Sequence, residues 1–142
     1  MRRPAAVAAA LVLLMTGLVA CSREPGPGDA LKTFLEGWTK GSFDGVTLQD
    51  ADGKPLAGPD GVKLLGDLSG DLVPSKAKLT AVGDPKESGD TATGSVKVEW
   101  TVAQGLVWAY DTTVQLRKVD KKWQVVLAPK AVHPQLEAGR HF

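Results

Sequence analysis

One tetrapeptide of this sequence has a spacing that nucleophilic catalysis uses. Ser75-Lys76-Ala77-Lys78 matches Ser-x-x-Lys, in which a lysine lies close enough to activate a serine hydroxyl. Enzymes of that kind also need Ser-x-Asn and Lys-Thr/Ser-Gly, but the chain has no asparagine and neither Lys-Thr-Gly nor Lys-Ser-Gly. Ser75 also follows Pro74 at the expected start of a strand, whereas such a serine belongs at the start of a helix. We therefore predict that Ser75 is not a nucleophile and that no residue of the chain is catalytic.

General acid–base chemistry would need an ionisable group inside an apolar cavity, which would shift its pKa. Tyr110 is one candidate, because it shares a predicted strand face with Trp108. A tyrosine in that position is more often a core residue with its hydroxyl at the rim. Asp111 and Glu99 alternate onto the opposite faces of their strands, where we expect solvent.

The sequence predicts no metal site and no cofactor. His133 and His141 are eight residues apart, with no neighbouring cysteine and no recognisable ligand spacing. His133 is expected to fix the His133-Pro134 corner. The chain contains neither a phosphate-binding P-loop nor a Gly-x-Gly-x-x-Gly dinucleotide fingerprint.

The only cysteine has a different chemistry. Arg2 and Arg3 precede an uncharged run over residues 5–20, which is the layout of an export signal. Leu18-Val19-Ala20-Cys21 then reads as a lipobox, in which Cys21 would be lipidated after cleavage. The alternatives are an ordinary signal peptide or an uncleaved anchor with a chance cysteine. The lipoprotein interpretation is favoured, because it explains a lone thiol in an exported protein.

Composition fits a small exported domain. The 142-residue chain has 17 basic and 16 acidic residues, and removing residues 1–20 removes two of the basic ones, which leaves a net charge of −1. The sequence shows no basic stripe, so we expect no nucleic-acid partner. We predict a lipoprotein signal peptide at 1–20, a flexible linker at 21–28 and one folded domain at 29–140. The protein is expected on the outer face of the cell membrane, held by the lipid on Cys21.

Helices come first in the folded part. Leu31, Phe34, Leu35 and Trp38 recur at i, i+3, i+4 and i+7, which predicts a helix over 29–40 ended by Gly41. Residues 47–73 are rich in glycine, aspartate and proline and read mostly as loops, with one short amphipathic helix within 62–68.

The period then changes to two, which indicates strands. The predicted strands cover residues 77–81, 91–102, 108–116 and 123–127, with a turn-rich connection over 84–90 and tight turns at Gln104-Gly105 and Asp120-Lys121. Pro129 should end the last strand, because proline cannot donate to a ladder, and the following segment is expected to be extended. The lysines around the last turn (Lys118, Lys121 and Lys122) are most simply a solvated tip. Contact with anionic lipid or wall polymer is the alternative.

Together these elements predict an α+β fold. The strands should form a four-stranded antiparallel meander, and the helices that precede them should pack on one face of this sheet. The apolar stripe from Leu31 to Trp38 should lie against Trp100, Trp108 and Trp123, while the threonine- and lysine-rich face meets water. The tryptophans could also line a ligand pocket, but an ordinary core is the simpler interpretation.

The pattern resembles a known family. A helix reading Leu-Lys-Thr-Phe-Leu-Glu-Gly-Trp-Thr-Lys-Gly over 31–41, followed by a long meander, resembles the nuclear-transport-factor-2-like (NTF2-like) cone. The exit, with Trp123-x-Val125, Pro129, Val132-His133-Pro134-x-Leu136 and Gly139, is similar to the NTF2-like N-terminal transpeptidase domain. That domain opens class B penicillin-binding proteins, including lipoprotein forms from actinobacteria and the methicillin-resistance type. Two features depart from the family: Leu127-Ala128-Pro129 replaces a second aromatic residue and Ser-Pro, and the middle segment is short and glycine-rich.

The resemblance implies a non-catalytic pedestal or interaction module for peptidoglycan transpeptidation. In the family a linker domain and a transpeptidase follow, so this sequence is expected to be either a truncated gene product or a stand-alone pedestal. Its expected partners are the membrane and a transpeptidase domain or other cell-wall synthesis proteins. The alternatives are a stand-alone lipoprotein that binds a small ligand in the cone, or an isomerase- or cyclase-like enzyme on the same fold. Fold alone does not separate these, because one fold hosts many functions.

Overall fold

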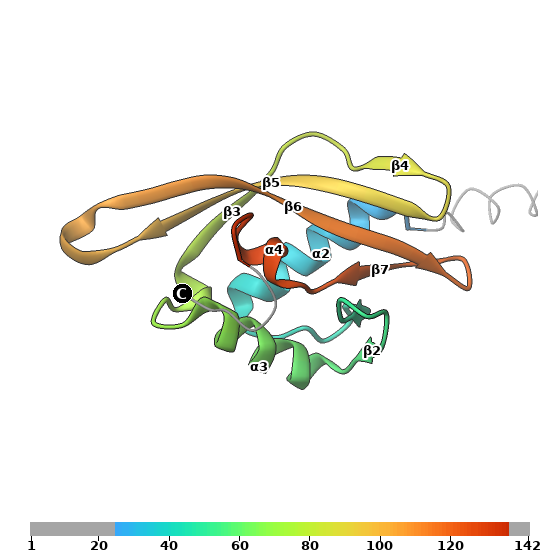
Figure 1. The fold of residues 1–142 in the computed structure, drawn as a ribbon, viewed down its shortest axis with the longest axis horizontal. Coiled ribbons are helices and arrows are strands. Elements are labelled where there is room, and N and C mark those ends of the chain that lie inside the picture. Colours follow the sequence, from blue (N-terminus) through green and yellow to red (C-terminus); the bar gives the residue numbers. More distant parts are fainter. Residues whose placement is uncertain (1–24, 137–142) are drawn as a thin grey trace, which may run out of the picture.

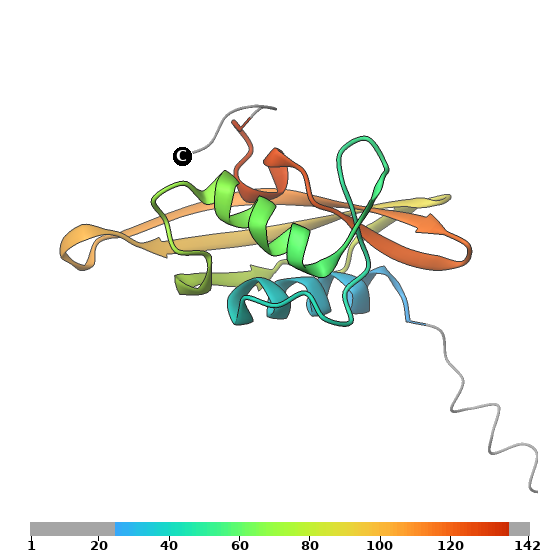
Figure 2. The same cartoon turned by 90° about the horizontal axis from the view of Figure 1, so that it is seen from below.

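The chain folds around a long two-stranded ribbon. Two helices lie against one part of the ribbon, and a third helix packs beside one of them (Figures 1 and 2). The computed structural model describes residues 25–136. The predicted signal peptide over residues 1–20, Cys21 and the residues from Glu137 to Phe142, including His141, lie outside this range.

The first helix is α2 (Pro27–Lys40). Its start lies two residues before the predicted one, inside the predicted linker, because Pro27 is pre-organised for a first helical turn. Asp29 accepts a hydrogen bond from the Gly26 N–H at 3.0 Å, which satisfies a donor beside the helix start. Gly41 ends the helix in the left-handed conformation at φ 73°, as its position in the sequence predicts.

The segment predicted to be mostly loop contains more structure than its composition indicates. It forms β1 (Leu48–Gln49), β2 (Pro55–Leu56) and α3 (Gly58–Ser69), which contains the short helix predicted within 62–68, and a 3₁₀ turn, η2 (Pro74–Lys76), follows it. β1 pairs in parallel with the last strand of the sheet, which a local sequence pattern does not reveal. Gln49, almost fully buried, donates to Gln124 at 3.0 Å and accepts from Arg117 at 3.0 Å, so β1 is tied to two strands far away in sequence.

The four predicted strands are confirmed as β3 (Ala77–Ala81), β5 (Thr91–Thr101), β6 (Val107–Val119) and β7 (Lys122–Val126). They pair antiparallel in that order, with η3 (Ala103–Gly105) joining β5 to β6. The connection at 84–90 was predicted as a turn, but it contains β4 (Lys86–Ser88), which pairs with β5. The described sheet has seven strands in the order β2-β1-β7-β6-β5-β3, with β4 beside β5.

The alternation of β5 separates core from solvent as predicted. Every second residue from Ala92 to Trp100 is buried, and the residues between them are exposed or partly exposed. Helix α2 packs on the buried face so closely that a Cβ on Gly94 would lie 2.6 Å from Leu31. Trp38 contacts Trp100 with a ring-centroid distance of 6.4 Å, and Trp123 is also buried in this core. The predicted α+β architecture is confirmed, with helices on one face of a sheet that is antiparallel except for the parallel pairing of β1 with β7.

Two predictions about the last third of the chain are wrong. Trp108 does not join the helix stripe: 37% of its surface is exposed, because the β5–β6 hairpin runs beyond the helices. The segment after Pro129 is not extended, but forms a short helix, α4 (Pro129–Val132). A proline at the first helical position costs no hydrogen bond, so the residue that stops β7 also starts α4.

Candidate functional site

The segment that leaves the sheet, residues 129–136, lies on the buried face of β6 rather than away from the domain (Figure 1). Ala131, Val132 and Leu136 are buried there. We call this segment the exit segment.

Tyr110 and Thr112 attach the exit segment to β6. The Tyr110 hydroxyl donates to the Val132 carbonyl at 2.6 Å and accepts from the Trp100 indole N–H at 2.9 Å. The Thr112 hydroxyl donates to the carbonyl of Lys130. Burial raises the pKa of Tyr110 above its ordinary value of 10.0, and the hydrogen bond from Trp100 partly offsets that rise. At physiological pH the phenol is therefore neutral, and its two hydrogen bonds link β5, β6 and the exit segment.

His133 closes the corner after α4. Its Nδ1 accepts a hydrogen bond from the Gln135 N–H at 3.1 Å, which fixes the turn through Pro134. The ring packs on Tyr110 at 4.4 Å and on Trp108 at 5.5 Å between centroids. The sequence predicted that His133 fixes the His-Pro corner, but it did not reveal that Trp108 and Tyr110 supply the surface against which the imidazole rests.

The other candidate residues are not brought together with this cluster. Asp111 is exposed, and Glu99 lies within 4 Å of Lys78 and Lys97 on the solvent-facing side of the sheet. Ser75 is exposed in the η2 turn, not at a helix start. The lysine three residues later forms one of the two ion pairs with Glu99, so its ammonium group faces a carboxylate. Between Pro25 and Leu136, no group of three or more His, Cys, Asp or Glu side chains could hold a metal ion.

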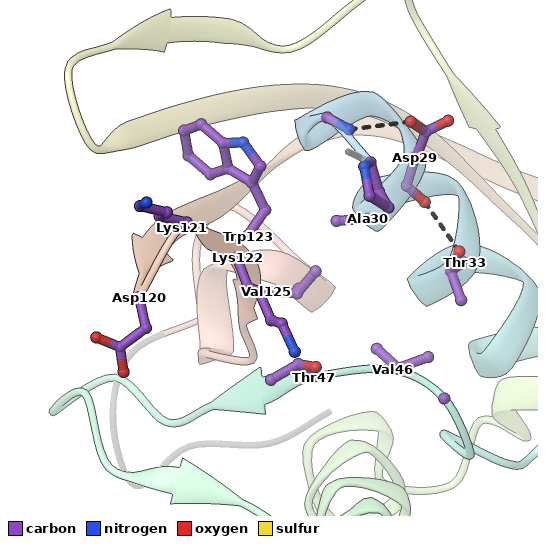
Figure 3. A pocket seen from close by; sticks show the side chains of 13 residues that line it. Asp29, Ala30, Thr33, Val46, Thr47, Asp120, Lys121, Lys122, Trp123 and Val125 are labelled. Atoms are coloured by element: carbon purple, nitrogen blue, oxygen red, sulfur yellow. Dashed lines mark hydrogen bonds between the residues drawn. The ribbon is translucent and has the colours of Figure 1, made fainter. Parts of the chain in front are cut away.

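A separate groove opens at one end of the molecule (Figure 3). It lies between the start of α2, the segment from Gly45 to Thr47 and the turn between β6 and β7, with a volume of about 640 Å³. Its floor is apolar, with Ala30, Val46 and Val125, and lysines stand at its rim. Sequence reasoning placed a lysine cluster at this turn but did not predict the groove, because the α2 start and the turn are some 90 residues apart along the chain.

The exit and the fold together carry the family signature. The model of the NTF2-like N-terminal transpeptidase domain matches residues 26–140. The chain belongs to this family. The match covers α2, the whole sheet and the exit segment, so the NTF2-like resemblance predicted from the sequence is confirmed. Among curated proteins, no sequence matches the chain.

The family match identifies the type of domain. It is an NTF2-like domain of the type that precedes transpeptidases in penicillin-binding proteins, and the match covers residues 26–140. None of the helices within the described range is long and apolar enough to cross a membrane.

The hydrogen bond at His133 predicts a pH dependence. Burial lowers the pKa of His133 below its ordinary value of 6.5, and protonated Nδ1 could no longer accept the bond from Gln135. Since the unfolded chain then binds the proton more readily, this contribution to stability is complete above pH 6.5 and declines as the pH falls below it. An NMR titration of an H141Q variant, in which His133 is the only histidine, should give a midpoint below 6.5. A midpoint at or above 6.5 would contradict the burial of the ring.

Proposed function

We propose that this protein is a lipid-anchored, non-catalytic pedestal, which holds a transpeptidase at a set height above the outer face of the cell membrane. The transpeptidase could be part of the same polypeptide or a separate protein. The observation that carries the proposal is the exit segment: in a domain of this family, residues near the end of the matched region accept hydrogen bonds from two side chains on the sheet, Tyr110 and Thr112, and His133 fixes the corner within the segment. A support needs a fixed direction in which the chain leaves it.

The anchor is the second part of the proposal. The lipobox over residues 18–21 supplies the cysteine, and two or more acyl chains give stable membrane attachment at about 0.8 kcal/mol per buried methylene. Helix α2 begins at Pro27, so the chain from Cys21 to Gly26 can extend by about 18 Å at most. A domain attached in this way stays close to the bilayer surface.

Replacing Cys21 with serine tests the anchor. We expect the variant to appear in the culture medium instead of the membrane fraction, because serine cannot take up the thioether-linked lipid. Immunoblots of the two fractions measure this, and a Ser22→Ala variant is the control that should stay with the membrane. Continued membrane retention of Cys21→Ser would contradict lipidation at that residue.

The proposal that the domain is non-catalytic is supported by the hydrogen bonds and positions of its ionisable side chains. In the described range, the tyrosine hydroxyl of the cone accepts one hydrogen bond and donates another within the chain, and the two candidate carboxylates are on the solvent side. An isomerase- or cyclase-like enzyme would instead keep an acid or base available inside the cone. The hydrogen bonds that engage the Tyr110 hydroxyl within the chain also favour the pedestal over a lipoprotein that binds a small ligand in the cone.

A fluorescent penicillin tests the absence of transpeptidase chemistry. We expect no covalent labelling of the purified 142-residue chain after denaturing electrophoresis, because no activated serine is available to open the lactam. A Ser75→Ala variant should be indistinguishable from the parent chain. Labelling that disappears in Ser75→Ala would show that the proposal is wrong about this residue.

A further inference from the structure

The turn between β6 and β7 is basic and lies beside the point where the described chain begins. Lys118, Lys121 and Lys122 are all exposed. Pro25 and Gly26 line the same groove as Lys121 and Lys122. Figures 1 and 2 show this hairpin at the same end of the molecule as the start of α2, while the β5–β6 hairpin lies at the opposite end.

The local fold holds these lysines on a rigid tip. Asp120 and Lys121 both have positive φ, at 50° and 67°, as expected of a two-residue type I′ hairpin turn. The ammonium group of Lys118 lies 5.7 Å from the centre of the Trp123 ring, a cation–π contact. Lys122 points towards Thr47 across the groove (Figure 3).

The acidic residues at this end do not neutralise the lysines. Among the residues that the structure describes, both salt bridges are at Glu99, on another part of the sheet. Of the two carboxylates that line the groove, Asp29 accepts from the Gly26 N–H, and Asp120 points away from α2 (Figure 3). Within the described residues none of the three ammonium groups forms a salt bridge, so each can meet an external anion such as phosphate.

We propose that the β6–β7 tip and the groove beside it bind the anionic phospholipid headgroups of the membrane in which the protein is anchored. The inference rests on the proposed lipid at Cys21. Pro25 is the fourth residue after Cys21, a reach of about 14 Å, so the anchor brings this end of the domain to the headgroups. The contact would orient the domain, with α2 and the β6–β7 tip towards the bilayer and the β5–β6 hairpin away from it.

The single cysteine allows a direct test. The core is formed by residues from Leu31 to Leu136, so the chain from Cys21 onwards keeps it complete. This mature chain is coupled through Cys21 to maleimide-bearing lipid in vesicles of either phosphatidylcholine or phosphatidylcholine with phosphatidylglycerol. Brief acylation with an amine-reactive reagent and mass spectrometry then give a modification rate for each lysine.

On the anionic vesicles, we expect the three tip lysines to be acylated several-fold more slowly than on neutral vesicles, and 1 M salt should remove the difference. Lys40, Lys63 and Lys76, exposed on other parts of the domain, serve as references whose rates should not change. The variant K118Q/K121Q/K122Q should lose this orientation. Amide exchange of residues 119–123 should then be the same on anionic and neutral vesicles. The control variant K40Q/K63Q/K76Q has the same change of charge and should behave as the parent chain.

Equal rates on both vesicles would overturn the inference. Protection by a soluble poly(glycerol phosphate) but not by anionic vesicles would also overturn it, because the phosphate would then belong to a wall polymer. Since the lipid is attached chemically here, neither result bears on whether Cys21 is lipidated in cells. A negative result in the Cys21→Ser experiment would conversely leave the headgroup measurement intact.

Discussion

Replacing Tyr110 with phenylalanine is expected to lower the free energy of unfolding by about 2 kcal/mol and to loosen the exit segment. The hydroxyl accepts from Trp100 and donates to Val132, and both of these residues are at most 1% exposed. Phenylalanine keeps the ring but leaves a buried N–H and a buried carbonyl without this partner, and an unsatisfied buried group costs about 1–3 kcal/mol.

Urea unfolding followed by tryptophan fluorescence measures the global effect, and amide exchange of residues 131–136 measures the local one. Thr112→Val, which removes the hydroxyl bonded to Lys130, should act in the same direction. The matched control is Thr113→Val. Thr113 follows Thr112 on the other face of β6 and is exposed, so its replacement should change the free energy of unfolding by less than about 0.5 kcal/mol. Unchanged exchange of the exit segment in Tyr110→Phe would contradict the role that we assign to the hydroxyl.

Replacing Gly37 with alanine is expected to destabilise the domain by about 1–3 kcal/mol, although alanine is the better helix former. Gly37 faces the chain that turns back after α2. A Cβ there would lie 2.7 Å from the Ser42 carbonyl oxygen and 2.7 Å from the Phe43 ring, and backbone cannot move aside as a flexible side chain can. Phe43 also stacks on Phe34 with 5.4 Å between ring centres, so displacing it disturbs the core.

Gly66→Ala is the matched variant, and we expect it to change stability in the opposite direction. Gly66 is also inside a helix, α3, but no atom lies within 4 Å of the position that its Cβ would take. Helix propensity alone then acts, and we expect a stabilisation of about 0.5–1 kcal/mol. Thermal or urea unfolding of both variants decides the point. Stabilisation by both substitutions would mean that α2 does not approach Ser42 and Phe43 as closely as described.

The sequence predicted what depends on contacts between neighbours in the chain. The period of 3.6 over α2 and the strict alternation of β5 each follow from one buried face, so they can be read without knowing what covers that face. The exit pattern around His133 also indicated the family, which the match confirms.

The tertiary structure decided which faces find a partner. Trp108 has the alternation of a core residue, yet 37% of its surface is exposed and its ring packs on His133 instead of on the α2 stripe. The two-residue strand β1 is too short to show a period, and it exists because Gln49 and Leu48 pair with β7. The lysine tip lies beside the start of α2 only because folding brings these two distant segments together. Periodicity reports burial along one segment, whereas these features depend on segments that are distant in sequence and adjacent in space.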